Sequence, residues 1–206
     1  MTVKLIWITP NAEQTIGDSA RVSAPENQGK DSTALIKYLI SHKHWSPLEM
    51  ANMCVEINTT RDIARQILRH RSFSFQEFSQ RYAAVDKLEL SPIREARLQD
   101  KKNRQNSIEF DDKTISALWE YKQDHVRRIC LEAYNEALAS GIAKEVARAV
   151  LPEGLTASRM YMNGSIRSWV HFYNLRSGNG TQRNVVLLQK TLAHFYRKIF
   201  RIYGTH

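Results

Sequence analysis

The sequence is poor in cysteine, glycine and proline. Its 206 residues include 2 cysteines, 8 glycines and 5 prolines. Cys54 and Cys130 lie far apart and belong to no C-x-x-C pair, which argues against a disulfide framework and against a cysteine zinc site. We therefore predict two buried, reduced thiols and no metal centre.

Long hydrophobic runs are also missing. No apolar stretch approaches the ~20 residues of a membrane helix, and the opening MTVKLIWITPNAE turns polar too early for a secretion signal. Hydrophobic residues make up 42% of the chain and charged residues 25%, close to the globular average, so a packed core is expected. These features predict a cytoplasmic protein with a single domain over residues 1–206 and no membrane partner.

Acidic residues are absent from the last quarter of the chain. Between Gly154 and His206 there is no Asp or Glu, whereas the whole chain carries a formal net charge of +9. The positive side chains of this quarter are Arg159, Arg167, Arg176, Arg183, Lys190, Arg197, Lys198 and Arg201. Such a field attracts nucleic acid, an acidic membrane surface or small phosphorylated ligands.

Hydrophobic periodicity and turn residues predict an α+β fold in which helices pack on one mixed or antiparallel sheet. Strands are predicted over residues 3–9, 51–58, 83–90 and 155–162. Helices are predicted over residues 32–42, 60–70, 113–139, 143–151, 165–176 and 185–203. Residues 20–32 are rich in Pro, Asn and Gly and predict a loop.

The stretch RHRSFSFQEFSQRY, residues 69–82, contains an unusually dense group of basic side chains. Its first residues, Arg69, His70 and Arg71, end a helix whose apolar side chains lie on the other face. A single cation there would complement the helix dipole, an effect worth about 0.3–1 kcal/mol. Three basic groups in a row repel one another unless an anion lies among them, which favours a phosphate or pyrophosphate partner.

The second half of this stretch allows two interpretations of Glu77. Its carboxylate forms a structural salt bridge, or it accepts hydrogen bonds from a sugar hydroxyl while Ser79 and Arg81 donate to a phosphate. The segment is expected to be a curved loop, made rigid by the packing of its three phenylalanines.

A second polar cluster lies in SIRSWVHFYNLR, residues 165–176. Arg167 and His171 are one turn apart on the face opposite the apolar residues. Arg176 ends the segment and is followed by SGNGTQ, a turn whose backbone amides can approach a ligand. Neither a G-x-G-x-x-G nor a P-loop motif is present.

These residues resemble a known family. RHRSFSFQEFSQRY is similar to the signature of the flavin-dependent thymidylate synthases, and four further blocks match in order: HWSPLEM, ARQILRHR, EVARAVLP and YMNGSIRSWVHFYNLRSGNGTQ. The resemblance implies methylation of dUMP at C5 to give dTMP, with methylenetetrahydrofolate as carbon donor and NADPH as the source of hydride through FAD. It also implies a homotetramer whose active sites are shared between subunits, and no nucleic-acid partner.

The resemblance further implies roles for individual residues. Flavin contacts fall on Ser23, Ser46, Glu49, Arg69, His70, Arg71, Glu77, Ser165, Arg167 and His171. The dUMP positions are Gln66, Arg69, Glu77, Ser79, Gln80, Arg81, Arg148 and Arg176. Arg176 matches the catalytic arginine that ionises or polarises the uracil at N3, a task suited to a guanidinium that stays protonated.

Three residues depart from the family pattern. Gln76 replaces the commoner Asn, Gln80 stands where Gly is frequent, and Asn184 stands where many members carry Glu. Two alternatives therefore stay open: a related nucleotide-binding flavoprotein that has lost methyl transfer, and a nucleic-acid-binding module that uses the basic last quarter.

Overall fold

The computed structural model describes residues 1–85, 93–104 and 106–176. A four-stranded antiparallel sheet forms its centre, in the order β1 (Thr2–Ile8), β2 (Asn52–Thr60), β6 (Ala157–Ser165) and β3 (Ser74–Glu77). A short hairpin, β4 (Leu98–Gln99) with β5 (Ser107–Ile108), forms a separate two-stranded sheet. The predicted α+β class with an antiparallel sheet is confirmed.

Alternating side chains give the sheet one apolar face. Val55 and Ile57 of β2 are fully buried and lie opposite Met162 and Met160 of β6. Their neighbours Glu56 and Tyr161 point to the other face, as the period of two in a strand requires. There the Tyr161 hydroxyl donates to the Glu56 carboxylate at 2.7 Å.

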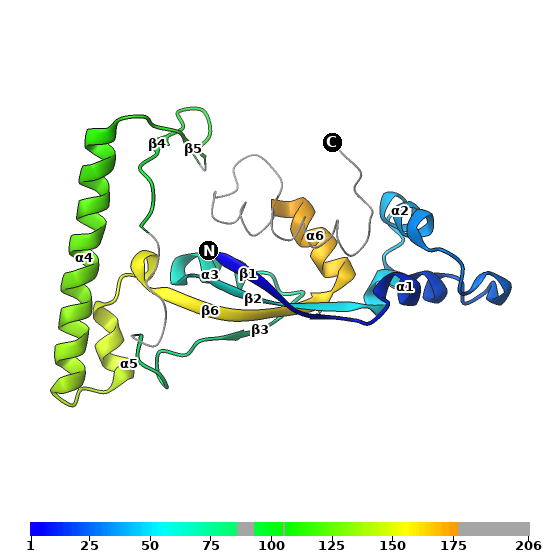
Figure 1. Cartoon of the computed structure of the whole chain (residues 1–206), viewed down its shortest axis with the longest axis horizontal. Coiled ribbons are helices and arrows are strands. Elements are labelled where there is room, and N and C mark those ends of the chain that lie inside the picture. The colour runs from blue at the N-terminus through cyan, green and yellow to red at the C-terminus, as the bar shows by residue number, and fades with distance from the viewer. Residues whose placement is uncertain (86–92, 105, 177–206) are drawn as a thin grey trace.

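Two helices cover the apolar face of the sheet, α3 (Arg61–Ile67) and α6 (Ile166–Arg176) (Figure 1). Trp169 of α6 is the largest fully buried side chain, and its indole Nε1 donates to the Met53 carbonyl at 3.0 Å. Phe172 and Phe73 pack edge to face against it. This cluster fixes α6 on the sheet.

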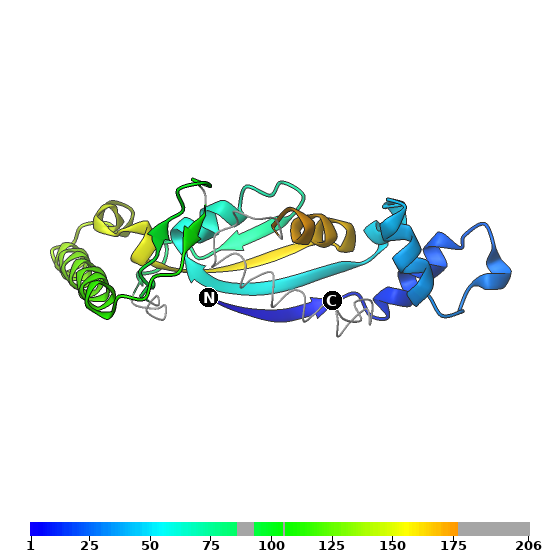
Figure 2. The same cartoon turned by 90° about the horizontal axis from the view of Figure 1, so that it is seen from above.

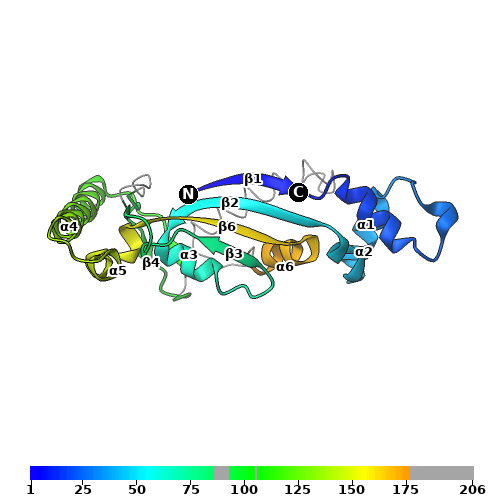
Figure 3. The ribbon, with the colours of Figure 1, turned by 90° about the horizontal axis from the view of Figure 1, so that it is seen from below.

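The remaining helices extend the molecule at its two ends (Figures 1 and 2). At one end lie α1 (Ala12–Ala20), the 3-10 helix η1 (Pro25–Asn27), α2 (Thr33–Ser41) and the 3-10 helix η2 (Ser46–Met50). At the other lie α4 (Lys113–Ala139), α5 (Lys144–Ala147) and the 3-10 helix η4 (Arg148–Val150). We call residues 113–150, together with residues 81–85 that contact them, the limb. The 3-10 helix η5 (Glu153–Leu155) joins the limb to β6, and Figure 3 shows the sheet between the two ends.

Most of the predicted elements are confirmed, with boundaries shifted by a few residues. Residues 74–77 were predicted as a loop and instead form strand β3, because they pair with the edge of β6. Residues 83–85 are not part of a strand, and residues 86–90 and the helix predicted over 185–203 lie outside the described residues. Cys54 is buried and Cys130 half-buried, and both are free thiols.

Helix α1 was not predicted from the sequence. Its sequence AEQTIGDSA contains a glycine and few apolar residues, and only Ala12, Ile16 and Gly17 are buried. Gly17 is required by packing, since a Cβ at this position would lie 1.8 Å from Ser32 Oγ. None of the helices among the described residues is both long enough and apolar enough to span a bilayer.

Candidate functional site

The ends of α3 and α6 meet above the sheet and bring two motif residues together. His70 follows α3, and Arg176 is the last residue of α6, 106 positions later. Arg176 Nε and Nη2 lie 3.0 and 2.7 Å from His70 Nε2. Nη2 also donates to the Gln66 backbone carbonyl at 3.3 Å. Arg176 is thus tied to the turn that carries the RHR sequence.

His70 is a neutral acceptor in this arrangement. Burial, followed by the charge of Arg176, lowers the pKa of His70 from 6.5 to about 4. Its ring packs edge to face on Phe172, with centroids 4.6 Å apart. The expectation of three adjacent cations is therefore wrong for His70, because burial beside a guanidinium disfavours a protonated imidazole.

The flanking arginines keep the site cationic. Arg69 and Arg71 are exposed on either side of His70. Burial and the charge of Arg69 both lower the pKa of Arg176, which shows that Arg69 acts on the same region. Two guanidinium groups in one electrostatic field form a favourable place for an anion.

A second group of motif residues lies where β6 leads into α6. Arg167 Nη1 bonds the Glu49 carboxylate of η2 at 2.5 Å, joining positions 118 residues apart. The hydrogen bond from Arg167 lowers the pKa of Glu49, against an opposing effect of burial, and Ser165 adds a further hydrogen bond. Both side chains of the ion pair remain partly exposed, so the pair is accessible from solvent.

Two further contacts hold this group in place. Trp45, next to η2, packs against His171 with ring centroids 4.4 Å apart. Ser168 Oγ donates to the Ser72 carbonyl at 3.1 Å and lies 3.2 Å from Ser165 Oγ. Helix α6 is thereby linked both to η2 and to the loop that follows the RHR sequence.

Glu77 lies at the end of β3 and has structural partners. Ser158 Oγ donates to Glu77 Oε1 at 2.6 Å, and Arg61 Nη1 lies 3.6 Å from the same oxygen. Among the described residues, Glu77 thus makes a salt bridge to Arg61, as the structural interpretation expects, and its contact with a ligand stays a prediction.

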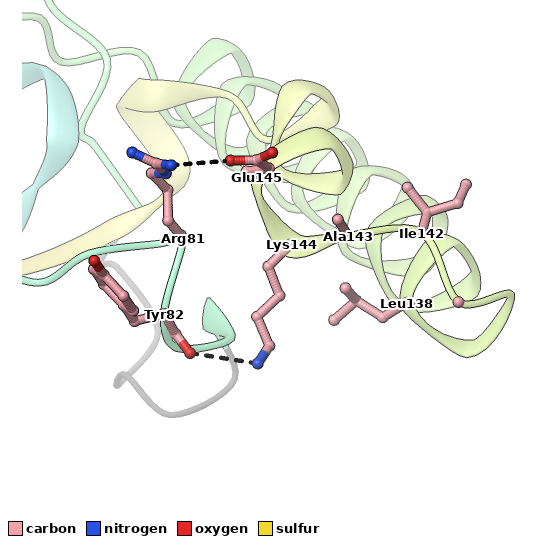
Figure 4. A pocket seen from close by; sticks show the side chains of 8 residues that line it. Arg81, Tyr82, Leu138, Ile142, Ala143, Lys144 and Glu145 are labelled. Carbon is pink, nitrogen blue, oxygen red and sulfur yellow. Dashed lines mark hydrogen bonds and ion pairs between the residues drawn. The ribbon is translucent and has the colours of Figure 1, made fainter.

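The limb brings a third group of residues together (Figure 4). Arg81 Nη2 lies 3.3 Å from Glu145 Oε2, and Lys144 Nζ donates to the Tyr82 carbonyl at 3.3 Å. These residues line a pocket of about 510 Å³ with apolar walls from Leu138, Ile142 and Ala143. Arg148 begins η4 close by, and its Nε donates to the Glu145 carbonyl at 3.2 Å.

The remaining residues predicted for the site make fewer contacts among the described residues. Ser79 Oγ accepts from the Arg81 amide at 3.4 Å. Gln80 is 4% exposed, and its Nε2 is buried without a hydrogen-bond partner among the described residues. Ser46 is exposed at the start of η2, and Ser23 is exposed in the segment after α1 at the far end of the molecule. The SGNGTQ turn and Asn184 lie outside the described residues.

Sequence reasoning missed several contact residues. Trp45, Ser72, Phe172 and Glu145 all touch a motif side chain. Each stands inside or beside one of the matched blocks. Their position in the sequence offered a signal, but only the tertiary contacts show which motif residue each one holds.

The fold and the site define an α+β protein that gathers arginines from separate elements around places suited to phosphorylated ligands. The family model described as "Thymidylate synthase complementing protein" matches residues 4–200. A probable flavin-dependent thymidylate synthase of Paramecium bursaria Chlorella virus 1 is 47% identical, over 97% of this chain and 95% of that protein. The flavin-dependent thymidylate synthase of Synechocystis sp. is 46% identical, over 91% and 84%. The chain belongs to this family, the flavin-dependent thymidylate synthases.

Solved structures agree with this assignment. The crystal structure of the UMP/dUMP methylase PolB from Streptomyces cacaoi bound with 5-Br UMP superposes with a TM-score of 0.83 at 26% identity. The match covers 96% of this chain and 89% of that chain. The same methylase bound with 5-Br dUMP gives a TM-score of 0.80. The fold is therefore shared with a nucleotide methylase.

Proposed function

We propose that the protein is a flavin-dependent thymidylate synthase that converts dUMP to dTMP, with methylenetetrahydrofolate as carbon donor and NADPH as reductant. The observation that supports this best is the junction of α3 and α6. There Arg176 is anchored by His70 and Gln66 and lies in the field of Arg69. A fixed guanidinium stabilises negative charge that develops on a pyrimidine ring as C5 becomes nucleophilic.

The residues present fit a flavin nucleotide. Arg167 and Arg71 supply cations for a pyrophosphate, and the Glu49 carboxylate accepts hydrogen bonds from sugar hydroxyls. Ser46 at the start of η2 and the ring of His171 on α6 are exposed, and Ser165, the buried last residue of β6, adds a hydrogen bond to Glu49. We assign FAD to these side chains together with Ser23, Arg69, His70 and Glu77. Bound FAD supplies the reducing hydride, which no amino-acid side chain can donate.

Substrate binding is assigned to the arginines of two regions. Arg81 and Arg148 of the limb suit the phosphate of dUMP, with Ser79 and Gln80 beside them. The four-stranded sheet with helices α3 and α6 and the turns that follow them is called the sheet region. It carries Gln66, Arg69, Glu77 and Arg176, which suit the sugar and the base. The protein's own contribution is to bind, orient and polarise the pyrimidine, since the carbon comes from the folate.

The cysteines are unsuited to nucleophilic attack, which agrees with a flavin-dependent route. Cys54 is buried in β2, and burial raises the pKa of its thiol. A thiol must ionise to act as a nucleophile, and a raised pKa opposes that. Cys130 is half-buried in α4, outside the groups of motif residues described above.

We also propose that the chain, a single domain over residues 1–206, assembles as a homotetramer in the cytoplasm with shared active sites. Motif residues lie at both ends of the molecule, in the limb at one end and around η2 at the other (Figure 1). In addition, α4 exposes a stripe at helical spacing, formed by Ile115, Leu118, Trp119, Val126 and Ile129. A large exposed apolar surface of this kind is typical of a subunit interface.

The direct test combines spectroscopy with turnover. The purified protein should be yellow, lose its visible flavin absorbance with NADPH under anaerobic conditions, and form dTMP from dUMP when the folate is added. A colourless protein with steeply salt-dependent nucleic-acid binding would support the nucleic-acid module instead. Flavin binding and reduction without dTMP formation would support the flavoprotein that has lost methyl transfer.

Two variants test the assigned roles. Arg176→Ala should abolish dTMP formation while FAD stays bound, and undiminished turnover would remove its catalytic role. Arg69→Ala should weaken both FAD and dUMP binding, on the order of 2–5 kcal/mol for loss of a charged partner that the bound ligand buries. The matched control is Arg128→Ala, since Arg128 is an exposed arginine of α4 whose ion pair among the described residues is with Asp124, four positions away.

A further inference from the structure

The guanidinium of Arg176 is held along one edge. Its Nε–H and one Nη2–H point to His70 Nε2, at 3.0 and 2.7 Å. The other Nη2–H donates to the Gln66 carbonyl at 3.3 Å. Of the five N–H donors of an arginine, these contacts occupy three. Among the described residues, the two donors on Nη1 make no hydrogen bond and stay available to a ligand.

His70, which binds the Nε/Nη2 edge of Arg176, is neutral. His70 Nε2 can accept from Arg176 only when it carries no proton, so the ring proton lies on Nδ1. The charged groups around the ring are Arg176 on α6 and Arg69 and Arg71 beside it in the chain. All three are cations, and it is burial, with the ring packed on Phe172, followed by the charge of Arg176 that opposes protonation of the imidazole.

A neutral acceptor has an electrostatic consequence that a carboxylate would not have. A carboxylate partner would cancel most of the positive charge of the arginine, as Glu145 does for Arg81 in the limb. An imidazole fixes the orientation of the guanidinium and leaves its full charge directed at the ligand.

We propose that His70 is a positioning residue for Arg176, which holds the Nε/Nη2 edge so that Nη1 faces the pyrimidine of the substrate. This role is separate from the flavin contact assigned to His70, and it rests on the proposed function for the identity of the ligand. The structural part, a neutral His70 coupled to Arg176, does not depend on that identity.

The first experiment is a double-mutant cycle on dUMP affinity, measured by calorimetry with the FAD-loaded protein. His70→Leu removes the acceptor and keeps an apolar side chain against Phe172. It should weaken dUMP binding on the order of tenfold, whereas His70→Gln, whose Oε1 can accept near the Nε2 position, should recover most of the affinity. In an Arg176→Ala background, His70→Leu should change dUMP affinity very little, because its effect passes through Arg176.

The outcomes separate the two roles of His70. Equal losses from His70→Leu with and without Arg176, or no recovery with Gln, would overturn the positioning role and leave only packing or flavin contact. FAD affinity is measured in parallel, since a loss confined to FAD binding would overturn it as well.

The second experiment needs neither dUMP nor turnover. Side-chain nitrogen NMR of the wild-type protein should show His70 with an unprotonated Nε2 at neutral pH. In Arg176→Ala the pKa of His70 should rise, because one of the two causes that lower it is removed. An unchanged pKa in Arg176→Ala would overturn the coupling even if the wild-type protein forms dTMP. A raised pKa in Arg176→Ala, together with a wild-type protein that forms no dTMP, would overturn only the proposed function.

Discussion

The sheet region and the limb are built in different ways. In the sheet region, α3 and α6 bury a continuous apolar cluster that includes Trp169, Phe172 and Phe73. In the limb, the 27-residue helix α4 buries only Gln123 and Tyr134, and the local core is small. A helix is stabilised mainly by packing of its apolar face. The sheet region can thus hold its own geometry, whereas the limb leaves an apolar stripe exposed, for which we propose a cover from another copy of the chain.

The same contrast appears in how each region holds an arginine. Arg176 is half-buried and bonded to a neutral imidazole. Arg81 is exposed and paired with a carboxylate at 3.3 Å. The guanidinium of Arg176 in the sheet region is therefore already oriented for a ligand. The guanidinium of Arg81 in the limb must first break its ion pair with Glu145 before it can bind one.

A pair of tryptophans gives the strongest test of the comparison. Trp169→Ala removes a fully buried side chain and its hydrogen bond to Met53, and should lower the free energy of unfolding by about 3–5 kcal/mol. Trp119→Ala, on the exposed stripe of α4, should change it much less when measured on the dissociated chain. Chemical denaturation at low protein concentration measures both. Equal losses would remove the distinction between the two regions.

Assembly provides the second test. Leu118→Glu places a charge in the exposed apolar stripe of α4 and should shift the protein to smaller species, because burying an unpaired carboxylate at an interface is unfavourable. Tyr121→Glu is the matched control, since Tyr121 is exposed on α4 outside the stripe. Sedimentation analysis should show dissociation for the first variant alone. Identical assembly of both variants would contradict the assignment of the stripe to an interface.

Acid should weaken the sheet region through His70. The pKa of His70 is about 4 in the folded protein, below the ordinary value of 6.5. Between these values the unfolded chain binds a proton that the folded chain does not, so stability is full above pH 6.5 and falls as the pH drops towards 4. Denaturation of wild type and His70→Gln at several pH values measures this contribution. The variant should lose stability less steeply, and equal slopes would show that His70 is not a buried neutral group.

The smallest effect is expected in the limb. Glu145→Gln frees Arg81 from its carboxylate, and exposed pairs of this kind are worth about 0.2–1 kcal/mol. Because the ligand no longer competes with Glu145, dUMP affinity should rise by up to about fivefold. Glu132→Gln, an exposed glutamate of α4, serves as the control for the change in net charge. A lower affinity in Glu145→Gln would mean that Glu145 holds Arg81 in place for the phosphate.

The sequence by itself determined the elements whose burial follows a simple period. Val55 and Ile57 alternate with polar residues in β2, and Trp169 and Phe172 share the apolar arc of α6, so both elements were predicted. The ordered motif blocks also determined the family, since their residue types and order are read directly from the chain.

Only the tertiary structure decided the partners and the charge states. Helix α1 depends on the close approach of Gly17 to Ser32, and β3 depends on pairing with β6. His70 is neutral because of burial and of an arginine 106 positions away. The physical reason is that periodicity specifies which face of an element is buried, whereas pKa values and ion pairs depend on groups that folding brings from distant parts of the chain.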